Sequence, residues 1–504
     1  MSYLYSSAGS RYSTRFKLLV TVFTLSLFLY VFPSLVCAQV LYGSLTGNVT
    51  DPSGAAVPNA KVEARETSKG VVQVTTTDAS GIYRFSALLP GTYDVTISES
   101  NFSTLLTKAV NVTANDARRL DAQLQINKVQ ESVTVTDQSP DLQTDRADVH
   151  TELEQKVIES LPAISSEGKS FQALYKIIPG ASPPIENNSS AGNPQRAMTS
   201  NVNGQSNQAN NTRIDGVQDA YPWLPQNIAY VPPEDAIQTV NIVTNSFDAE
   251  QGMAGGAAVN VQIKSGTNKF HGDAHELHTD NALSALNYFN APNFKKPLNV
   301  FNQFGGALGG PIKKDKLFFF ADWESTRQAQ APSANLQTVP TGGLQFTNAQ
   351  NNGFFDFRGI TDAQGRPVNV YDPRTGNANG TGRQVINCNG VQNEICLSDV
   401  DPAALQMAAL IPSANVAGAT TNNLFVEQSG FFHRDNIDAK INYIPTQNST
   451  IFGRYSFSRS NIFDPPALDS AGGNATLGGQ PGNAFSRIQV VGWVGPMPSV
   501  PRFF

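Results

Sequence analysis

The chain has 504 residues, which is more than a single hydrophobic core usually serves, so two or three structural units are expected. Its formal net charge is -6, from 35 Lys and Arg against 41 Asp and Glu. This acidic balance argues against nucleic acid as a partner, because binding to a phosphate backbone requires an excess of basic residues. The 40 Gly and 30 Pro, together with many Asn, Gln, Ser and Thr, favour strands and turns over helices.

The N-terminus has the organisation of a secretory signal peptide. Three basic residues precede an apolar run at 18–31, and small residues follow it. This pattern predicts a signal peptide over residues 1–38, cleaved between Ala38 and Gln39. A retained membrane anchor is the less favoured alternative, because the run is short for a membrane-spanning helix.

Two cysteines, Cys388 and Cys396, remain after the signal peptide, and both lie in a polar stretch. In the oxidising compartment that export implies, a short-loop disulfide between them is the expected state. A metal site is the less favoured alternative, because no second cysteine pair and no nearby histidine completes a ligand set.

Residues 40–127 have the pattern of short alternating strands. Turn signals containing Pro, Asp or Gly occur at 51–54, 77–81 and 89–91. The apolar residues at alternate positions between these turns supply two faces, which predicts a seven-stranded β-sandwich.

The amino-acid sequence of this region is similar to that of a known domain. Residues 47–62 (GNVTDPSGAAVPNAKV), with 77–85 and 89–93, resemble the carboxypeptidase regulatory-like domain. The resemblance implies a β-sandwich appendage without catalytic zinc. No His and Glu ligand set lies within the stretch, in agreement with that expectation.

A polar and β-branched run lies in the linker at 128–138. Its central residues are Glu131, Ser132, Val133, Thr134, Val135 and Thr136. Such a run can add to the edge of another sheet, because backbone hydrogen bonds carry strand addition and the side chains can vary. An ordinary linker strand would have the same composition, so both interpretations remain open at this point.

Residues 139–265 combine helix signals with glycine-containing strands. A capping box at 151–154 predicts the start of a helix that Pro162 ends, and a second short helix is expected near 171–177. Five motifs then follow in order, at 202–204, 212–217, 233–240, 247–252 and 255–261.

This series resembles the plug domain of TonB-dependent outer-membrane receptors of the Oar-like group. The resemblance implies a mixed α/β plug over 139–265. It also implies that residues 131–136 are a TonB box, which pairs edge to edge with a TonB-like periplasmic energy-coupling protein.

Residues 266–504 are expected to form the first strands of an antiparallel transmembrane β-barrel. The segment 436–443 alternates polar and apolar residues, and 451–458 repeats the alternation after a short turn. One face suits outer-membrane lipid and the other suits water, although a soluble sandwich strand alternates in the same way. A barrel that encloses a plug needs roughly 22 strands. The residues after 265 are too few to supply that number together with long loops, so we expect a C-terminally truncated or frame-disrupted receptor.

No catalytic or cofactor site is predicted. His271, His275 and His278 lie near Asp273 and Glu276, which suggests a metal site. In an extended strand, however, the first two histidines share a face and the third points away, so solvent-facing strand residues are preferred. No HExxH and no GxSxG sequence occurs, so the chain is not expected to be an enzyme.

The leading hypothesis is therefore a receptor of the bacterial outer membrane with its N-terminal domain in the periplasm. By the resemblance, it would bind an extracellular ligand, such as a carbohydrate or a peptide, and import it with energy from the inner membrane. The alternative is a surface structural or adhesion protein that binds glycans or proteins without transport.

Overall fold

The computed structural model describes residues 42–114, 116–126, 132–136, 147–161, 164–165, 168–186, 193–220, 224, 227–247, 251–252, 254–285, 288, 296, 298–331, 335–426, 428–446, 449–473 and 482–494. The predicted cleavage point at Ala38 and Gln39 lies outside these ranges, as does Glu131. Strands dominate the described part of the chain, and its helices are short. None of those helices has the length and hydropathy needed to cross a membrane.

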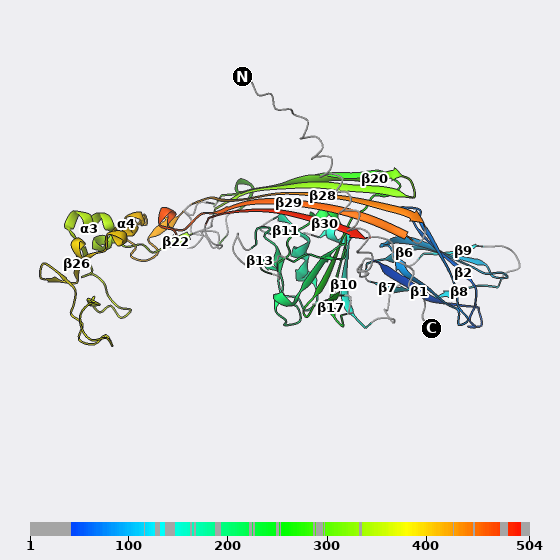
Figure 1. The fold of residues 1–504 in the computed structure, drawn as a ribbon, viewed down its shortest axis with the longest axis horizontal. Helices are drawn as coiled ribbons and strands as arrows, with labels where there is room; N and C mark the ends of the chain where they lie inside the picture. Colours follow the sequence, from blue (N-terminus) through cyan, green and yellow to red (C-terminus); the bar gives the residue numbers. More distant parts are fainter. Residues whose placement is uncertain are drawn as a thin grey trace, which may run out of the picture. The chain divides into compact units, whose positions relative to one another are not determined.

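The N-terminal unit consists of two sheets that share one apolar core (Figure 1). The first sheet contains β1 (Gly43–Thr50), β4 (Ile82–Leu88), β7 (Ala117–Arg119) and β8 (Ala122–Gln123). The second has the order β3 (Val72–Thr76), β2 (Lys61–Glu66), β5 (Gly91–Ser98), β6 (Thr104–Val112) and β9 (Ser132–Thr136). Buried and exposed residues alternate along β1 and β5, as expected for strands with one face on a core. The unit has nine strands where the sequence predicted seven, and one of the additional strands, β9, comes from the linker.

The central unit contains a five-stranded sheet and several short helices. Its strand order is β10 (Val149–Glu154), β17 (Ile237–Asn245), β18 (Ala258–Ile263), β15 (Asn211–Ile214) and β16 (Val217–Gln218). The helices beside it include α2 (Gln155–Ser160) and the 3₁₀ turns η1 (Phe171–Ile177) and η3 (Glu234–Ala236). Buried apolar residues of these elements form one core, which includes Leu153, Phe171 and Tyr230.

The capping-box prediction at 151–154 was wrong. These residues belong to β10, where Thr151 is opposite Ile242 of β17, and the helix begins only at Gln155. Glu154 makes no side-chain capping bond. Pairing with a neighbouring strand therefore outweighed the local helix signal in this stretch.

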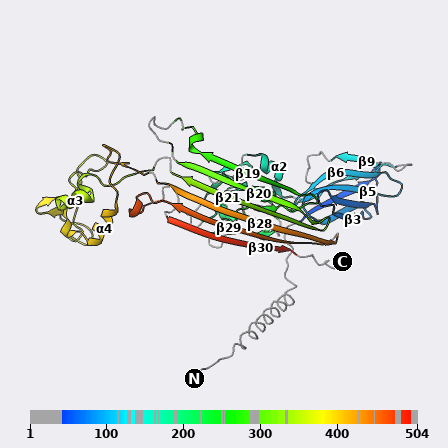
Figure 2. The same ribbon diagram turned by 90° about the horizontal axis from the view of Figure 1, so that it is seen from above.

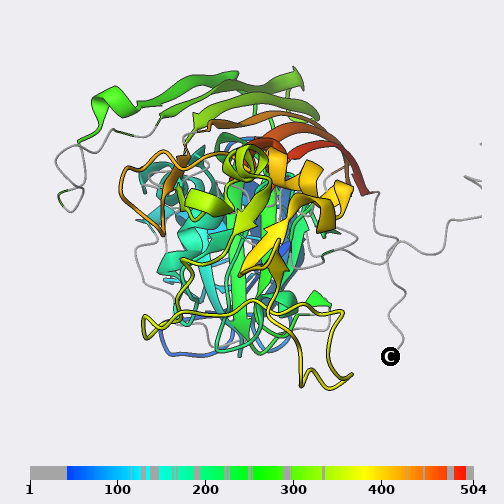
Figure 3. The same cartoon turned by 90° about the vertical axis from the view of Figure 1, so that its left-hand side faces the viewer.

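The C-terminal unit is a six-stranded antiparallel sheet (Figure 2). Its order is β19 (His271–Asp280), β20 (Asn299–Lys313), β21 (Leu317–Gln330), β28 (Gly430–Thr446), β29 (Ser449–Asp464) and β30 (Gly482–Val494). Figure 3 shows that the sheet is curved. It is open, since β19 and β30 do not pair with each other in the described structure.

The polarity of this sheet is inverted relative to that of a soluble protein. On β28, Asp438 is 0% exposed, whereas Ile441 is 51% exposed. On β29, Arg454 is 2% exposed and Tyr455 is 41% exposed. A soluble sandwich buries the apolar face of such strands, whereas a membrane barrel turns it outward toward lipid. The direction of burial therefore favours the membrane interpretation, which the alternating sequence alone left open.

A long excursion joins β21 to β28. It contains α3 (Phe346–Asn352), α4 (Pro402–Leu410) and small two-stranded pairs, so this long loop has regular structure of its own. Within it, a disulfide joins Cys388 to Cys396, with the two Cα atoms 5.0 Å apart.

Candidate functional site

The segment that the sequence singled out for partner pairing lies at the edge of a sheet. β9 runs parallel to β6, from Ser132 opposite Thr104 to Thr136 opposite Lys108. It is the last strand of the five-stranded sheet, so β6 occupies one of its edges and no other described strand pairs with it. A strand in this position presents a row of backbone donors and acceptors that can pair with another chain.

A second feature, which the sequence did not predict, is a cluster of buried charges between the central unit and the six-stranded sheet. Asp215 provides its carboxylate from the turn between β15 and β16, where Asp215 and Gly216 have φ of 48° and 79°. An Asp-Gly pair with both φ values positive is typical of a type I′ hairpin turn. The turn projects the carboxylate toward Lys440 and Arg454, which are opposite each other on β28 and β29.

These three residues form ion pairs with almost no solvent exposure. The Nζ of Lys440 lies 2.9 Å from Oδ1 of Asp215, and Nε of Arg454 lies 3.1 Å from Oδ2. Lys440 also donates a hydrogen bond of 2.9 Å to the carbonyl oxygen of Ile263 in β18. Each charge therefore has a partner, which a charge in a low-dielectric site requires.

Polar contacts extend this cluster along the sheet. The hydroxyl groups of Tyr230 and Ser456 both donate to the carboxylate of Asp438, which lies 3.6 Å from Arg454. Farther along β28, the side-chain amide of Asn436 donates to the carbonyl oxygen of Val231 at 3.0 Å. We call Asp215, Lys440, Arg454, Asp438 and Tyr230 the ionic interface.

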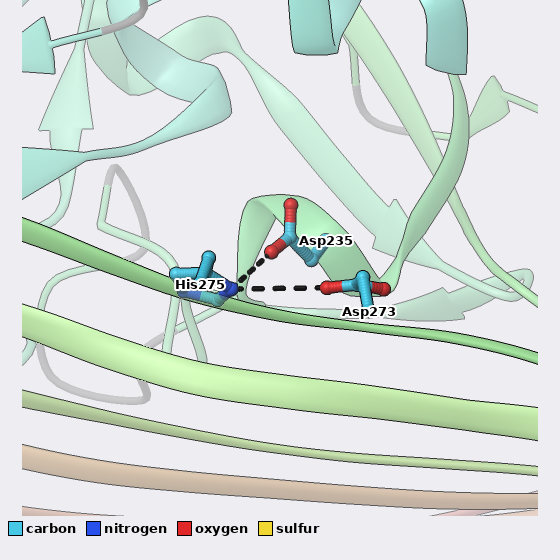
Figure 4. A group of neighbouring side chains, drawn as sticks. All are labelled: Asp235, Asp273 and His275. Atoms are coloured by element: carbon cyan, nitrogen blue, oxygen red, sulfur yellow. Dashed lines mark ion pairs between the residues drawn. The ribbon is translucent and has the colours of Figure 1, made fainter.

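A third cluster joins the central unit to β19 (Figure 4). Oδ2 of Asp235, in η3, lies 2.5 Å from Nδ1 of His275, and Oδ2 of Asp273 lies 3.8 Å from the same nitrogen. The sequence placed His275 on one face with His271 and put His278 on the other face, and the structure includes only His275 of the three in this cluster. Nδ1 of His278 contacts Oδ1 of Asn302 at 2.6 Å instead. Asp235 could not be identified from the sequence as a member of this cluster, because it belongs to a different element.

Asp219, beside the ionic interface, has an altered protonation equilibrium. Its burial raises its pKa to about 7, against the opposing effects of a backbone hydrogen bond from Tyr230 and the charge of Arg454. The N–H of Tyr230 donates to Oδ1 of Asp219 at 3.1 Å.

Comparisons with known proteins agree with this architecture. Residues 262–495 match the outer membrane beta barrel domain, and residues 44–125 match the carboxypeptidase regulatory-like domain. The TonB-dependent transporter Oar of Myxococcus xanthus is 28% identical over 330 residues, which cover 61% of this chain and 30% of Oar.

Among solved structures, a ferric enterobactin receptor (PfeA) from Pseudomonas aeruginosa is 12% identical with a TM-score of 0.35, and the match covers 68% of this chain and 37% of the receptor. The siderophore receptor PirA from Acinetobacter baumannii is 14% identical with a TM-score of 0.31, over 69% of this chain and 44% of PirA. TM-scores of this size do not by themselves establish a shared fold.

The chain thus combines a region that matches the outer membrane beta barrel domain with an N-terminal carboxypeptidase regulatory-like domain. It is similar to the TonB-dependent transporter Oar, and its location is the outer membrane. Because the match spans less than a third of Oar, the activity and partners of the whole protein are matters for proposal.

Removing one charge from the ionic interface should destabilise the protein more than removing two. In Asp215→Leu, Lys440 loses its carboxylate partner inside a buried site, and we expect a loss of about 3–5 kcal/mol in unfolding free energy. Adding Lys440→Met should recover at least half of that loss, since Arg454 keeps Asp438. Urea unfolding in detergent micelles measures the unfolding free energy of both variants.

Arg374→Ala, at an exposed ion pair with Asp372, should change the unfolding free energy little and serves as the control. A double variant as unstable as Asp215→Leu would contradict the argument.

The raised pKa of Asp219 predicts a pH-dependent stability. The unfolded carboxyl group ionises near its ordinary pKa of about 4, whereas the folded one holds its proton to about 7. Unfolding therefore becomes easier as the pH rises from about 4 to 7, by a few kcal/mol at most, and changes no further above that range. Asp219→Asn should flatten this part of the profile. Urea midpoints at several pH values test this, and an unchanged slope in the variant would show that another group is responsible.

Proposed function

We propose that this protein acts as a TonB-dependent receptor that binds an extracellular ligand and imports it with energy supplied from the inner membrane. The observation that carries the proposal is the order of parts along the chain. A strand with a free edge, β9, directly precedes a central unit that is held on the polar face of a membrane sheet by the ionic interface. The similarity to Oar supports the same role.

The proposal assigns a function to each segment. Residues 40–127 are the periplasmic sandwich, 128–138 the TonB-box linker, 139–265 the plug and 266–504 the barrel strands. The partner is a TonB-like periplasmic protein that adds a strand to β9. The role is binding and transport rather than catalysis, and a carbohydrate or a peptide is a suitable class of ligand for the polar loops.

The ionic interface suits a plug that must both hold and move. While the interface is dry, breaking one ion pair leaves a buried charge without a partner, which costs about 3–5 kcal/mol and keeps the plug in place. Once a pulled plug admits water, the same charged groups are solvated, so this part of the contact exposes little apolar surface. An apolar contact of equal area would instead oppose hydration throughout the movement.

A surface adhesion role is the alternative, and the ordered excursion between β21 and β28, with its Cys388–Cys396 disulfide, favours it. In that role the central unit would remain fixed. A movement of the plug relative to the barrel strands on partner binding therefore distinguishes the two functions.

Pairing through β9 should depend on backbone groups rather than on side chains. We expect Val133→Pro combined with Val135→Pro to lower the affinity for the purified periplasmic domain of a TonB protein at least tenfold, because proline removes backbone donors. The matched pair Val133→Ala and Val135→Ala should stay within about threefold of the parent affinity. Biolayer interferometry with the full chain in detergent measures both. Equal binding by the proline variant would contradict the assignment of the TonB box.

We further expect the partner to add to the free edge of β9 without displacing β6, since this route breaks no existing hydrogen bonds and uses a strand that is already ordered. Leu106→Cys with Thr134→Cys places cysteines at opposite positions of the two strands, at a spacing that a disulfide can bridge. Oxidation should leave the partner affinity within about threefold. The parent protein under the same oxidation is the control. A large loss on oxidation alone would show that the partner takes the edge held by β6.

A further inference from the structure

The cluster of Asp235, Asp273 and His275 has a geometry that a simple ion pair does not explain. The two carboxylates come from different elements, η3 and β19, and both approach Nδ1 of the same imidazole (Figure 4). A protonated His275 paired with Asp235 would account for the contact of 2.5 Å. It leaves a second carboxylate, that of Asp273, beside the same nitrogen, because Asp273 and His275 are alternate residues on one face of β19.

We propose that these three side chains form a binding site for a divalent transition-metal ion of the zinc class. One imidazole nitrogen and two carboxylate oxygens are a ligand set that such ions accept, with water completing the coordination. In a tetrahedral zinc centre with bonds of about 2.1 Å, neighbouring ligand atoms lie roughly 3.4 Å apart. The distances of 2.5 and 3.8 Å to Nδ1 lie on either side of that value, and all three ligand atoms are within 4.8 Å of one another.

The other ring nitrogen of His275 has a carboxylate nearby, although at a distance longer than a hydrogen bond. Its Nε2 lies 3.9 Å from Oε2 of Glu324, a carboxylate on β21 that is 4% exposed. Histidine ligands usually donate their second N–H to a carboxylate or carbonyl, which orients the ring and directs the unprotonated nitrogen toward the metal. Glu324 is itself held by Arg434 at 3.7 Å.

The sheet is built so that His275 and Glu324 can meet across an intervening strand. Both residues are opposite Gly305 of β20, one on each side. Adjacent strands are about 4.8 Å apart, so the two Cα atoms are separated by roughly 10 Å. A Cβ atom at position 305 would clash with the carbonyl oxygen of Trp323 and lie 2.9 Å from the Cα of Glu324, so only glycine fits between the two residues.

A further buried carboxylate lies one register row away. Asp322 of β21 is opposite Ala307, which is opposite Asp273. Asp322 is 6% exposed, and neither of its carboxylate oxygens has a hydrogen-bond partner within the described structure. A buried carboxyl group without a hydrogen-bond partner is costly unless a water molecule or an ion satisfies it.

An ion at this position would join the central unit to β19, the first strand of the six-stranded sheet, because one ligand comes from η3 and two from β19. The three residues also line a cavity of about 1010 Å³, through which an ion can reach them. Metal binding at this site does not depend on the proposed function, since it requires neither a TonB-like partner nor transport.

Metal content tests the proposal directly. The purified full chain in detergent is stripped with a chelator, dialysed against Zn²⁺ or Co²⁺, and analysed by mass spectrometry of the metal. We expect one ion per chain, and visible Co²⁺ absorption typical of a low-coordinate site. Asp273→Asn and His275→Asn should each weaken binding at least tenfold. His278→Asn, on the same strand but paired with Asn302, should bind as the parent does.

The parent chain alone can overturn the proposal, whatever the variants do. A metal content no higher than that of a chelator-treated sample would show that the cluster is an ordinary ion pair. Equal binding by Asp273→Asn and His275→Asn would place any bound ion elsewhere. Circular dichroism of each variant separates loss of the site from loss of the fold, and Asp273→Asn changes a partly exposed side chain with little change in volume.

Discussion

The polar inner face of the six-stranded sheet must be covered by another polar surface, and the rest of the architecture follows from this constraint. Asp438, Lys440 and Arg454 point away from the apolar face and are almost fully buried. Charges in that position are stable only if each has a partner of opposite charge or a hydrogen-bonding group. The central unit supplies these groups through Asp215 and Tyr230, so the strands and the unit beneath them specify each other's position.

An apolar core stabilises the central unit but does not determine where the unit lies on the sheet. Leu153, Phe171 and similar buried residues form that core, as in a small soluble domain. The turn carboxylate of Asp215 and the phenol of Tyr230 face the barrel strands, and the core also packs against Phe320 of β21. The charged part of this surface can be dry and well ordered in one state and hydrated in another, because water can take the place of each ionic partner.

The sequence predicted the strands better than their partners. The alternation at 436–443 located β28, yet the strand extends over Gly430–Thr446, since pairing with β21 and β29 continues beyond the alternating segment. The segment 131–136 was predicted to be extended, but its amino-acid sequence does not indicate that β6 is its neighbour. The capping box at 151–154 failed for the same reason, because a distant strand, β17, decided the conformation.

Sites whose residues come from distant segments could not be predicted from the sequence. An Asp-Gly pair at 215 and 216 predicts a turn, but it does not reveal that the turn carboxylate will meet two cations more than two hundred residues later. The histidines of β19 were visible as a group, and strand periodicity correctly separated His278 from His275. The decisive ligand, Asp235, comes from a short turn in another unit, and only the folded chain brings it to the imidazole.

Among the contacts that attach the central unit to the sheet, the ionic interface and the contact of Asp235 with His275 lie far apart, and their positions affect how the unit could move. The ionic interface lies on β28 and β29, whereas Asp235 contacts β19, three strands away from β28 in the sheet order. Two attachments so spaced resist rotation of the unit as well as its withdrawal, which a single attachment could not do. A pull transmitted through β10, which pairs with β17 at the edge of the central sheet, first loads an edge strand rather than either attachment. Partial unfolding that begins at this edge can therefore occur while both attachments remain intact, and it requires less free energy than displacing the whole unit, because only the pairing of one strand is lost.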